Sequence, residues 1–146
     1  MKVEIKIDPG RDETTVLILA KEINDEVNEL FKSLSRQDSQ VVVGFRDDSA
    51  TVLGVEEIMR IYAAVQKVFI VTGDGEYVSK LRLYELEERL PGNIFVRTSN
   101  SEIVNLQKVR DFDLSFSGRI GVRFLDGSTT YVSRRYVAKI KKKLGL

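Results

Sequence analysis

The chain has no cysteine and no histidine among its 146 residues. Without cysteine there is no disulfide framework, no thiolate zinc site and no thiol nucleophile. Without histidine, imidazole bases, Ser-His-Asp triads and most transition-metal sites are excluded as well. We therefore predict that the protein is not an enzyme and that it needs neither a metal ion nor another cofactor.

Long apolar runs are also missing. No stretch approaches the roughly 20 residues that a membrane-spanning helix needs, and the start, Met1-Lys2-Val3-Glu4, lacks the apolar core of a secretory signal. Apolar residues still make up 42% and charged residues 31% of the chain, as in folded globular domains. We expect a cytoplasmic protein with one domain and a small accessory element.

The formal net charge of +1 hides a division along the chain. Residues 1–88 contain 11 Lys/Arg and 18 Asp/Glu, a net charge of −7, whereas residues 89–146 contain 12 Lys/Arg and 4 Asp/Glu, a net charge of +8. The later basic residues are spread over several expected elements and are interleaved with short polar side chains that can bond bases or phosphates. This pattern indicates double-stranded DNA rather than a membrane, for which an amphipathic helix with bulky apolar anchors is expected.

Residues 1–40 are predicted to form a separate ββα segment. Apolar and charged residues alternate over 2–8, as in a half-buried strand that ends at Pro9-Gly10, and a second strand is expected at 15–19. Apolar residues then recur at helical spacing: Ile23, Val27, Leu30, Phe31 and Leu34. Because two strands and one helix bury little alone, we expect this segment to dock on the rest of the chain or to pair with a second copy as a homodimer.

Residues 41–146 are predicted to form a mostly β (α+β) domain. Short strand-like runs are separated by turn signals such as Gly73-Asp74-Gly75 and Asp126-Gly127. A short amphipathic helix is expected over 83–90. A terminal helix is expected from Ser133, a suitable N-cap, because apolar residues at helical spacing and a lysine cluster follow it.

Two motifs in this region resemble the LytTR DNA-binding domain family. They are Ser101-x-x-Val104-Asn105 and Val132-Ser133-Arg134-Arg135-Tyr136, and the order of the elements around them agrees. The resemblance covers about residues 45–144. It implies an elongated stack of small antiparallel sheets with short helices. It also implies a bacterial transcription regulator that docks loops into successive major grooves of direct repeats in promoters.

The same resemblance suggests which residues meet DNA. Base-reading loops fall at about Gln66-Lys67, at Asn100 and at Arg135, with phosphate contacts beside them. The DNA-binding residues predicted in this way, or from the basic pattern, are Gln66, Lys67, Arg97, Asn100, Ser101, Ser133, Arg134, Arg135 and Lys139. Ser99-Asn100 replaces the His-Arg of many family members, so their base preference does not carry over. We expect Asn105 to bond backbone in a turn, and Phe124 and Tyr136 to lie in the core.

The position of Arg135 in the first turn of a helix supports a DNA contact by this residue independently of the resemblance. A cation there opposes the helix dipole and is mildly unfavourable unless it meets an anion.

One alternative remains open, a protein-interaction module that captures a partner without binding DNA. Salt-sensitive binding to duplex DNA distinguishes the two functions. Similar stand-alone regulators are often encoded beside a small membrane protein that restrains them, so the resemblance also implies a partner of that kind.

Overall fold

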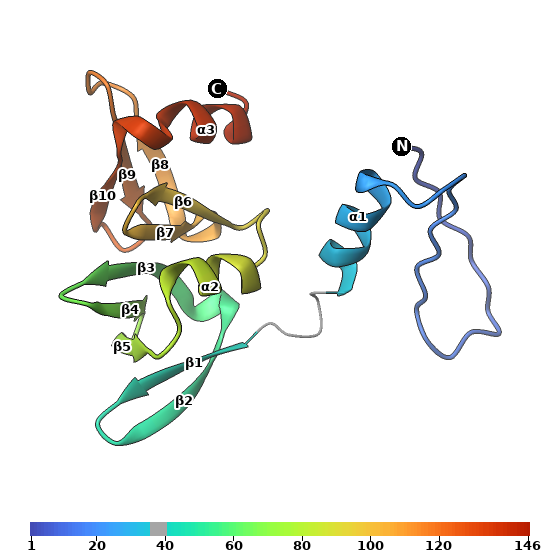
Figure 1. Cartoon of the computed structure of the whole chain (residues 1–146), viewed down its shortest axis with the longest axis horizontal. Helices are drawn as coiled ribbons and strands as arrows, with labels where there is room; N and C mark the ends of the chain where they lie inside the picture. The colour runs from blue at the N-terminus through green and yellow to red at the C-terminus, as the bar shows by residue number, and fades with distance from the viewer. Residues whose placement is uncertain (36–40) are drawn as a thin grey trace. The chain divides into compact units, whose positions relative to one another are not determined.

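The computed structural model describes residues 1–35 and 41–146, which fall into two compact units that divide after Ser35 (Figure 1). The unit that follows the division contains all the β-strands and both hydrophobic cores found among the described residues. None of the described helices is long and apolar enough to cross a membrane.

The first unit contains one regular element, α1 (Asp25–Ser35), within residues 1–35. Asn24 caps this helix, since its Oδ1 accepts a hydrogen bond from the backbone N–H of Val27 at 3.0 Å. The helix of the expected ββα segment is therefore confirmed. The prediction of two strands, at 2–8 and 15–19, is wrong for the single chain. Neither run pairs with a strand among the described residues.

A seven-stranded antiparallel sheet forms the larger part of the second unit. Its strands follow the order β2-β1-β5-β4-β3-β7-β6. Their bounds are β1 (Val41–Arg46), β2 (Ser49–Gly54), β3 (Ile58–Ala64), β4 (Lys67–Thr72), β5 (Gly75–Ser79), β6 (Phe95–Ser99) and β7 (Glu102–Asn105). Helix α2 (Leu83–Arg89) closes the core of this sheet with Leu83 and Leu86.

A three-stranded antiparallel sheet and the last helix complete the unit. The strands β8 (Val109–Asp113), β9 (Ile120–Phe124) and β10 (Thr129–Val132) follow the order β10-β9-β8, and α3 (Arg134–Leu144) comes directly after them. The lysines at the end of α3 suit the negative end of the helix dipole. These elements enclose a second core that includes Phe124, Val132 and Ile140.

The β6–β7 hairpin lies between the two cores. Successive side chains of a strand point to opposite faces. Phe95 and Ile103 accordingly belong to the first core, whereas Val96 and Val104 belong to the second. This hairpin fixes the two sheets against each other, and the expected mostly β stack of antiparallel sheets with short helices is confirmed.

Candidate nucleic-acid interface

The β3–β4 hairpin presents Gln66 and Lys67 to solvent. Its two-residue turn consists of Val65 and Gln66, whose φ angles are +51° and +61°. Two positive φ values identify a type I′ turn, whose twist matches that of the flanking strands. Val65 is 89% exposed, and Gln66 and Lys67 beside it are also exposed.

A shallow hollow of about 360 Å³ lies beside this turn, between the hairpin and the start of α2. Gln66, Lys67 and Arg97 line it together, so three predicted DNA-binding residues meet at one place. Arg82 lines it too and was missed by the sequence analysis. Arg82 occupies the N-cap of α2, and the helix-dipole argument used for Arg135 could have identified it.

Arg97 holds the turn between β6 and β7. Its Nε donates to the carbonyl of Ser99 at 2.8 Å and its Nη2 to the carbonyl of Asn100 at 2.7 Å. Its Nη1 also lies 3.4 Å from a carboxylate oxygen of Glu87, and the side chain is only 14% exposed. The guanidinium is therefore largely engaged within the protein and shapes the turn that carries Asn100 and Ser101.

Hydrogen bonds connect this turn to the two neighbouring elements. The carbonyl of Ser101 accepts from the backbone N–H of Ala63, at the end of β3, at 2.8 Å. The Asn100 Oδ1 accepts from the hydroxyl of Tyr136 on α3 at 3.0 Å. The β3–β4 hairpin, the β6–β7 turn and the beginning of α3 thus form one continuous surface.

The start of α3 adds cations to this surface. Ser133 occupies the N-cap, and its backbone N–H donates to the carbonyl of Thr98 on β6 at 2.9 Å. Arg134 and Arg135 follow and are exposed, and the first turn of α3 contains no acidic residue. Lys139 lies further along the helix and is also exposed.

Other cations of the C-terminal part contact groups of the protein itself. The Nε of Arg123 lies 2.6 Å from a carboxylate oxygen of Asp111. The guanidinium of Arg119 lies over the ring of Tyr131, 4.2 Å from its centroid. Lys143 donates to the carbonyl of Gly92, and burial, with a smaller contribution from the charge of Lys139, lowers the pKa of its ammonium group.

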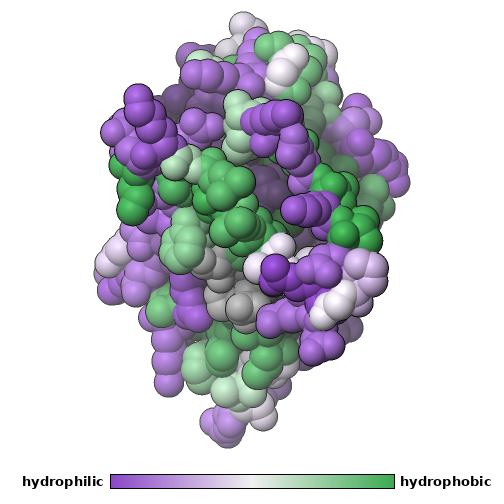
Figure 2. Space-filling model, turned by 90° about the vertical axis from the view of Figure 1, so that its right-hand side faces the viewer, coloured by the Kyte–Doolittle hydropathy of each residue, from purple (hydrophilic) through white to green (hydrophobic). Residues whose placement is uncertain are grey.

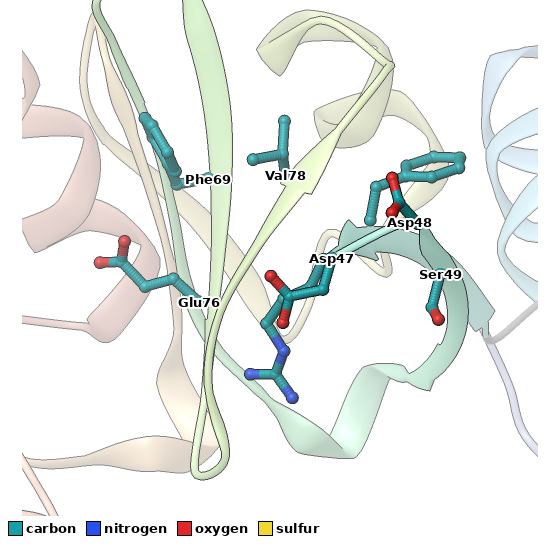
Figure 3. A pocket seen from close by; sticks show the side chains of 8 residues that line it. Asp47, Asp48, Ser49, Phe69, Glu76 and Val78 are labelled. Atoms are coloured by element: carbon teal, nitrogen blue, oxygen red, sulfur yellow. The ribbon is translucent and has the colours of Figure 1, made fainter.

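A second hollow of about 440 Å³ lies by the β1–β2 turn, and its lining includes three carboxylates, the guanidinium of Arg46 and apolar side chains (Figure 3). Asp47 and Asp48 form that turn, and Glu76 lines the hollow with them. Carboxylates repel the phosphate backbone of DNA. Because these carboxylates outnumber Arg46, this hollow is less suited to a nucleic acid than the hollow beside Gln66, whose charged lining residues are all cations.

Asn105, the last residue of the Ser101-x-x-Val104-Asn105 motif, has a structural role. Asn105 is 1% exposed; its Nδ2 donates to the carbonyl of Ile58 at 2.7 Å and its Oδ1 accepts from the N–H of Gln107 at 2.8 Å. The expectation that it bonds backbone is confirmed, as is the core position of Phe124, which is 0% exposed. Tyr136 is half-buried, with its hydroxyl on Asn100.

Glu102 was missed by the sequence analysis. It is 6% exposed, lies 2.5 Å from a guanidinium nitrogen of Arg60 and accepts from the hydroxyl of Thr130 at 2.6 Å. A single carboxylate thereby connects β7 with β3 and with β10 of the smaller sheet.

Known proteins resemble this chain over the second unit and over its full length. The family model of the LytTr DNA-binding domain matches residues 48–145. An HTH-type transcriptional regulator of Staphylococcus aureus strain NCTC 8325 is 33% identical over 147 aligned positions, covering 100% of this chain and 99% of its own length. The corresponding regulator of strain MRSA252 is 32% identical over the same share of each chain.

One solved structure supports the fold. The LytTr DNA-binding domain of a Bacillus cereus protein described as a methyl-accepting/DNA response regulator superposes with a TM-score of 0.72 at 23% identity, covering 74% of this chain and 99% of its own. The family model matches more than half of the chain, and the Staphylococcus aureus relatives cover all of it. The chain therefore belongs to the LytTR family of DNA-binding transcriptional regulators.

Proposed function

We propose that the protein binds promoter DNA sequence-specifically through three adjoining parts of its surface. These parts are the hairpin tip at Gln66-Lys67, the turn at Asn100-Ser101 and the start of α3 at Arg134-Arg135. The observation that carries the proposal is the bond of Tyr136 to Asn100, which joins two sequence-distant polar elements side by side. This bond holds the two elements in one arrangement before DNA binds, which favours base readout.

The chemistry of these side chains suggests a role for each. Arg135 is suited to a bidentate contact with guanine in the major groove. The Oδ1 of Asn100 already accepts from Tyr136, so Asn100 is suited to donate its Nδ2 to a base there, with adenine as the favoured partner. Ser133, Arg134 and Lys139 lie beside them and are suited to phosphate contacts, which supply much of the affinity. Gln66 and Lys67 offer the same two kinds of contact at the hairpin tip.

Arg97 and Arg82 have roles that differ from the sequence-based prediction. Arg97 has its donors on the carbonyls of Ser99 and Asn100, so we assign it the positioning of the turn rather than a contact with a base. Arg82 lines the same hollow as Gln66 and Lys67, so we add it as a phosphate contact. Each role follows from where the guanidinium lies.

The docking element we propose is not a helix-turn-helix. In the described part of the DNA-binding unit, α2 and α3 are separated in the chain by the five strands β6 to β10. A helix-turn-helix needs two helices joined by a short turn. Turns and the N-terminal end of α3 therefore take the place of a recognition helix, although the Staphylococcus aureus relatives carry "HTH-type" in their names.

Further properties are proposed from the resemblance to LytTR regulators. We infer that the targets are paired direct repeats. Independently of the resemblance, the composition of the chain suggests the cytoplasm, and the little surface that residues 1–40 can bury alone suggests a homodimer. We also infer that a small membrane protein restrains it. Co-purification from cells that express the neighbouring membrane protein, with and without detergent, tests that last partner.

Selection of bound sequences from random duplex DNA tests the proposed function. One consensus should emerge, and the logarithm of its affinity should fall linearly with the logarithm of salt concentration. A scrambled duplex should bind more weakly at every salt concentration. If the protein binds no duplex at low salt, the DNA-binding mode fails and the protein-interaction module replaces it.

A further inference from the structure

The first unit exposes an unusual concentration of large apolar side chains. Each of the following is at least 63% exposed: Val3, Ile5, Ile7, Val16, Leu17, Leu19, Ile23 and Phe31. In Figure 2 hydrophobic side chains lie open at the surface among hydrophilic ones. Apolar surface on this scale is normally covered by a partner.

Charged residues alternate with apolar ones in the first of these runs. Lys2, Glu4, Lys6 and Asp8 occupy the even positions, and Val3, Ile5 and Ile7 the odd ones. In a strand, the two sets point to opposite faces. A turn ends the run, because the Asp8 carbonyl accepts from the N–H of Arg11 at 3.1 Å and its carboxylate from the N–H of Gly10 at 3.2 Å.

The charges of this run are complementary to the same run read backwards. We propose that residues 2–8 pair antiparallel with residues 2–8 of a second copy, with the two Ile5 side chains opposite each other on the two-fold axis. In that register Lys2 lies opposite Asp8 of the second copy, and Glu4 lies opposite Lys6. Each cross-strand charge pair is attractive, and Val3 lies opposite Ile7 on the apolar face.

The same charges disfavour the neighbouring registers. A shift of two residues in one direction places Glu4 opposite Glu4, and a shift in the other direction places Lys6 opposite Lys6. Like charges directly opposite each other are destabilising. A shift of one residue would place charged side chains opposite apolar ones, and parallel pairing in register brings like charges side by side.

A second copy also supplies what the single chain lacks. One hairpin of two strands is marginal in water, whereas three or more strands with a covered face are stable. Two copies that each contribute 2–8 and the apolar run at 15–19 provide four strands. The apolar face of α1, with Val27, Leu30 and Leu34, is then available to cover the apolar face of that sheet.

Charge exchange tests the intermolecular pairing without DNA, so its outcome is independent of the proposed DNA binding. Glu4→Lys and Lys6→Glu each place two like-charge pairs in every dimer, and each should raise the dimer dissociation constant roughly tenfold. An equimolar mixture of the two variants should dimerise as tightly as the unmodified protein, since every pair is again attractive. Sedimentation of each variant and of the mixture measures this, and a mixture that is no tighter than its components overturns the proposal.

Cysteine cross-linking tests the register, since the chain has no cysteine of its own. Ile5→Cys should cross-link to itself under mild oxidation, because directly opposite Cα atoms fall within disulfide range. Ile7→Cys alone should cross-link poorly but should do so efficiently when mixed with Val3→Cys. Val65→Cys is a control of similar exposure in the other unit. Equal cross-linking at all positions, or an unmodified protein that stays monomeric, contradicts the proposal.

Discussion

Arginine and lysine side chains of the C-terminal part differ in what they contact. Arg97, Arg123 and Lys143 are already bonded to carbonyls or carboxylates of the protein. Arg135 and Lys139, by contrast, are exposed on α3. The net charge of +8 over residues 89–146 therefore overstates how many cations can meet DNA, and the exposed cations without a partner among the described residues are those to test.

Arg135→Ala is expected to weaken binding to the selected duplex by roughly 1–3 kcal/mol and to relax preference at one base position, because a bidentate contact is lost. Binding isotherms on duplexes that differ at single positions measure both effects. Arg123→Ala is the matched control, since Arg123 is an exposed arginine paired with Asp111 on the smaller sheet. Unchanged binding by Arg135→Ala, or a loss equal to that of the control, would disprove a base contact.

Lys139→Ala is expected to act differently. Loss of a phosphate contact should weaken all duplexes to a similar extent and reduce the salt slope by about one unit. Isotherms on specific and scrambled duplexes at several salt concentrations separate this from a base contact. A change confined to the specific duplex would show that Lys139 reads sequence instead.

Glu102→Ala is expected to lower the free energy of unfolding by about 3 kcal/mol, because it leaves Arg60 and Thr130 without their shared acceptor in a largely buried place. The magnitude is at the low end for buried ion pairs, since Arg60 keeps 27% exposure. Glu87→Ala is the control: the side chain of Glu87 is 44% exposed, and its loss should cost less than about 1 kcal/mol. Urea unfolding of both variants measures the difference, and equal losses would contradict the structural role of Glu102.

The range of each contact explains which residues the sequence could identify. Asn105 was predicted correctly because one of its bonds reaches only to Gln107, a local turn contact. Glu102 was missed because Arg60 is 42 positions and Thr130 is 28 positions away in the chain. Local polar motifs can be interpreted from one sequence, whereas buried pairs depend on which strands become neighbours.

At the scale of elements, some hairpin turns can be predicted from the sequence and others cannot. Gly73-Asp74-Gly75 predicts a turn because glycine tolerates positive φ, and Gly75 has φ +115°. Val65 gives no such signal, because a β-branched residue at positive φ is rare. The prediction of a base-reading loop at Gln66-Lys67 rests only on the family resemblance.

Val65→Asn is expected to raise the free energy of unfolding by about 1 kcal/mol. Asparagine accepts the left-handed conformation of a type I′ turn, and Val65 buries almost nothing that would be lost. Thermal or urea unfolding measures the gain. Val52→Asn, on an exposed position of β2, should instead lose stability because asparagine is a poor strand former. A loss at both positions would mean that the turn is not strained by Val65.

The first unit shows why alternation alone does not define a strand. Residues 2–8 have the period of a half-buried strand, yet a strand also needs a neighbour for its backbone and a cover for its apolar face. The cap at Asn24 and the apolar spacing of α1 are local, so the helix was predictable. Pairing depends on another chain or element, which a single sequence does not specify.

At the scale of the whole molecule, DNA binding and self-association are assigned to different units. Every residue of the two hydrophobic cores lies at position 42 or later, so the second unit has its own interior. The same unit contains all nine predicted DNA-binding residues.

The LytTR family consists of transcription regulators without catalytic function, which confirms the prediction that the protein is not an enzyme.

A chain of residues 41–146 is therefore expected to unfold cooperatively and to bind a single repeat within about twofold of the full chain, since no contact to DNA is removed. It should sediment as a monomer and lose the added affinity for two repeats on one duplex, because linked sites gain affinity through effective concentration alone. Sedimentation and isotherms on one-repeat and two-repeat duplexes measure both. If the shortened chain matches the full chain in self-association and on two repeats, residues 1–40 do not join two copies. If it loses the single repeat instead, those residues contact DNA themselves, and the division of roles between the units is wrong.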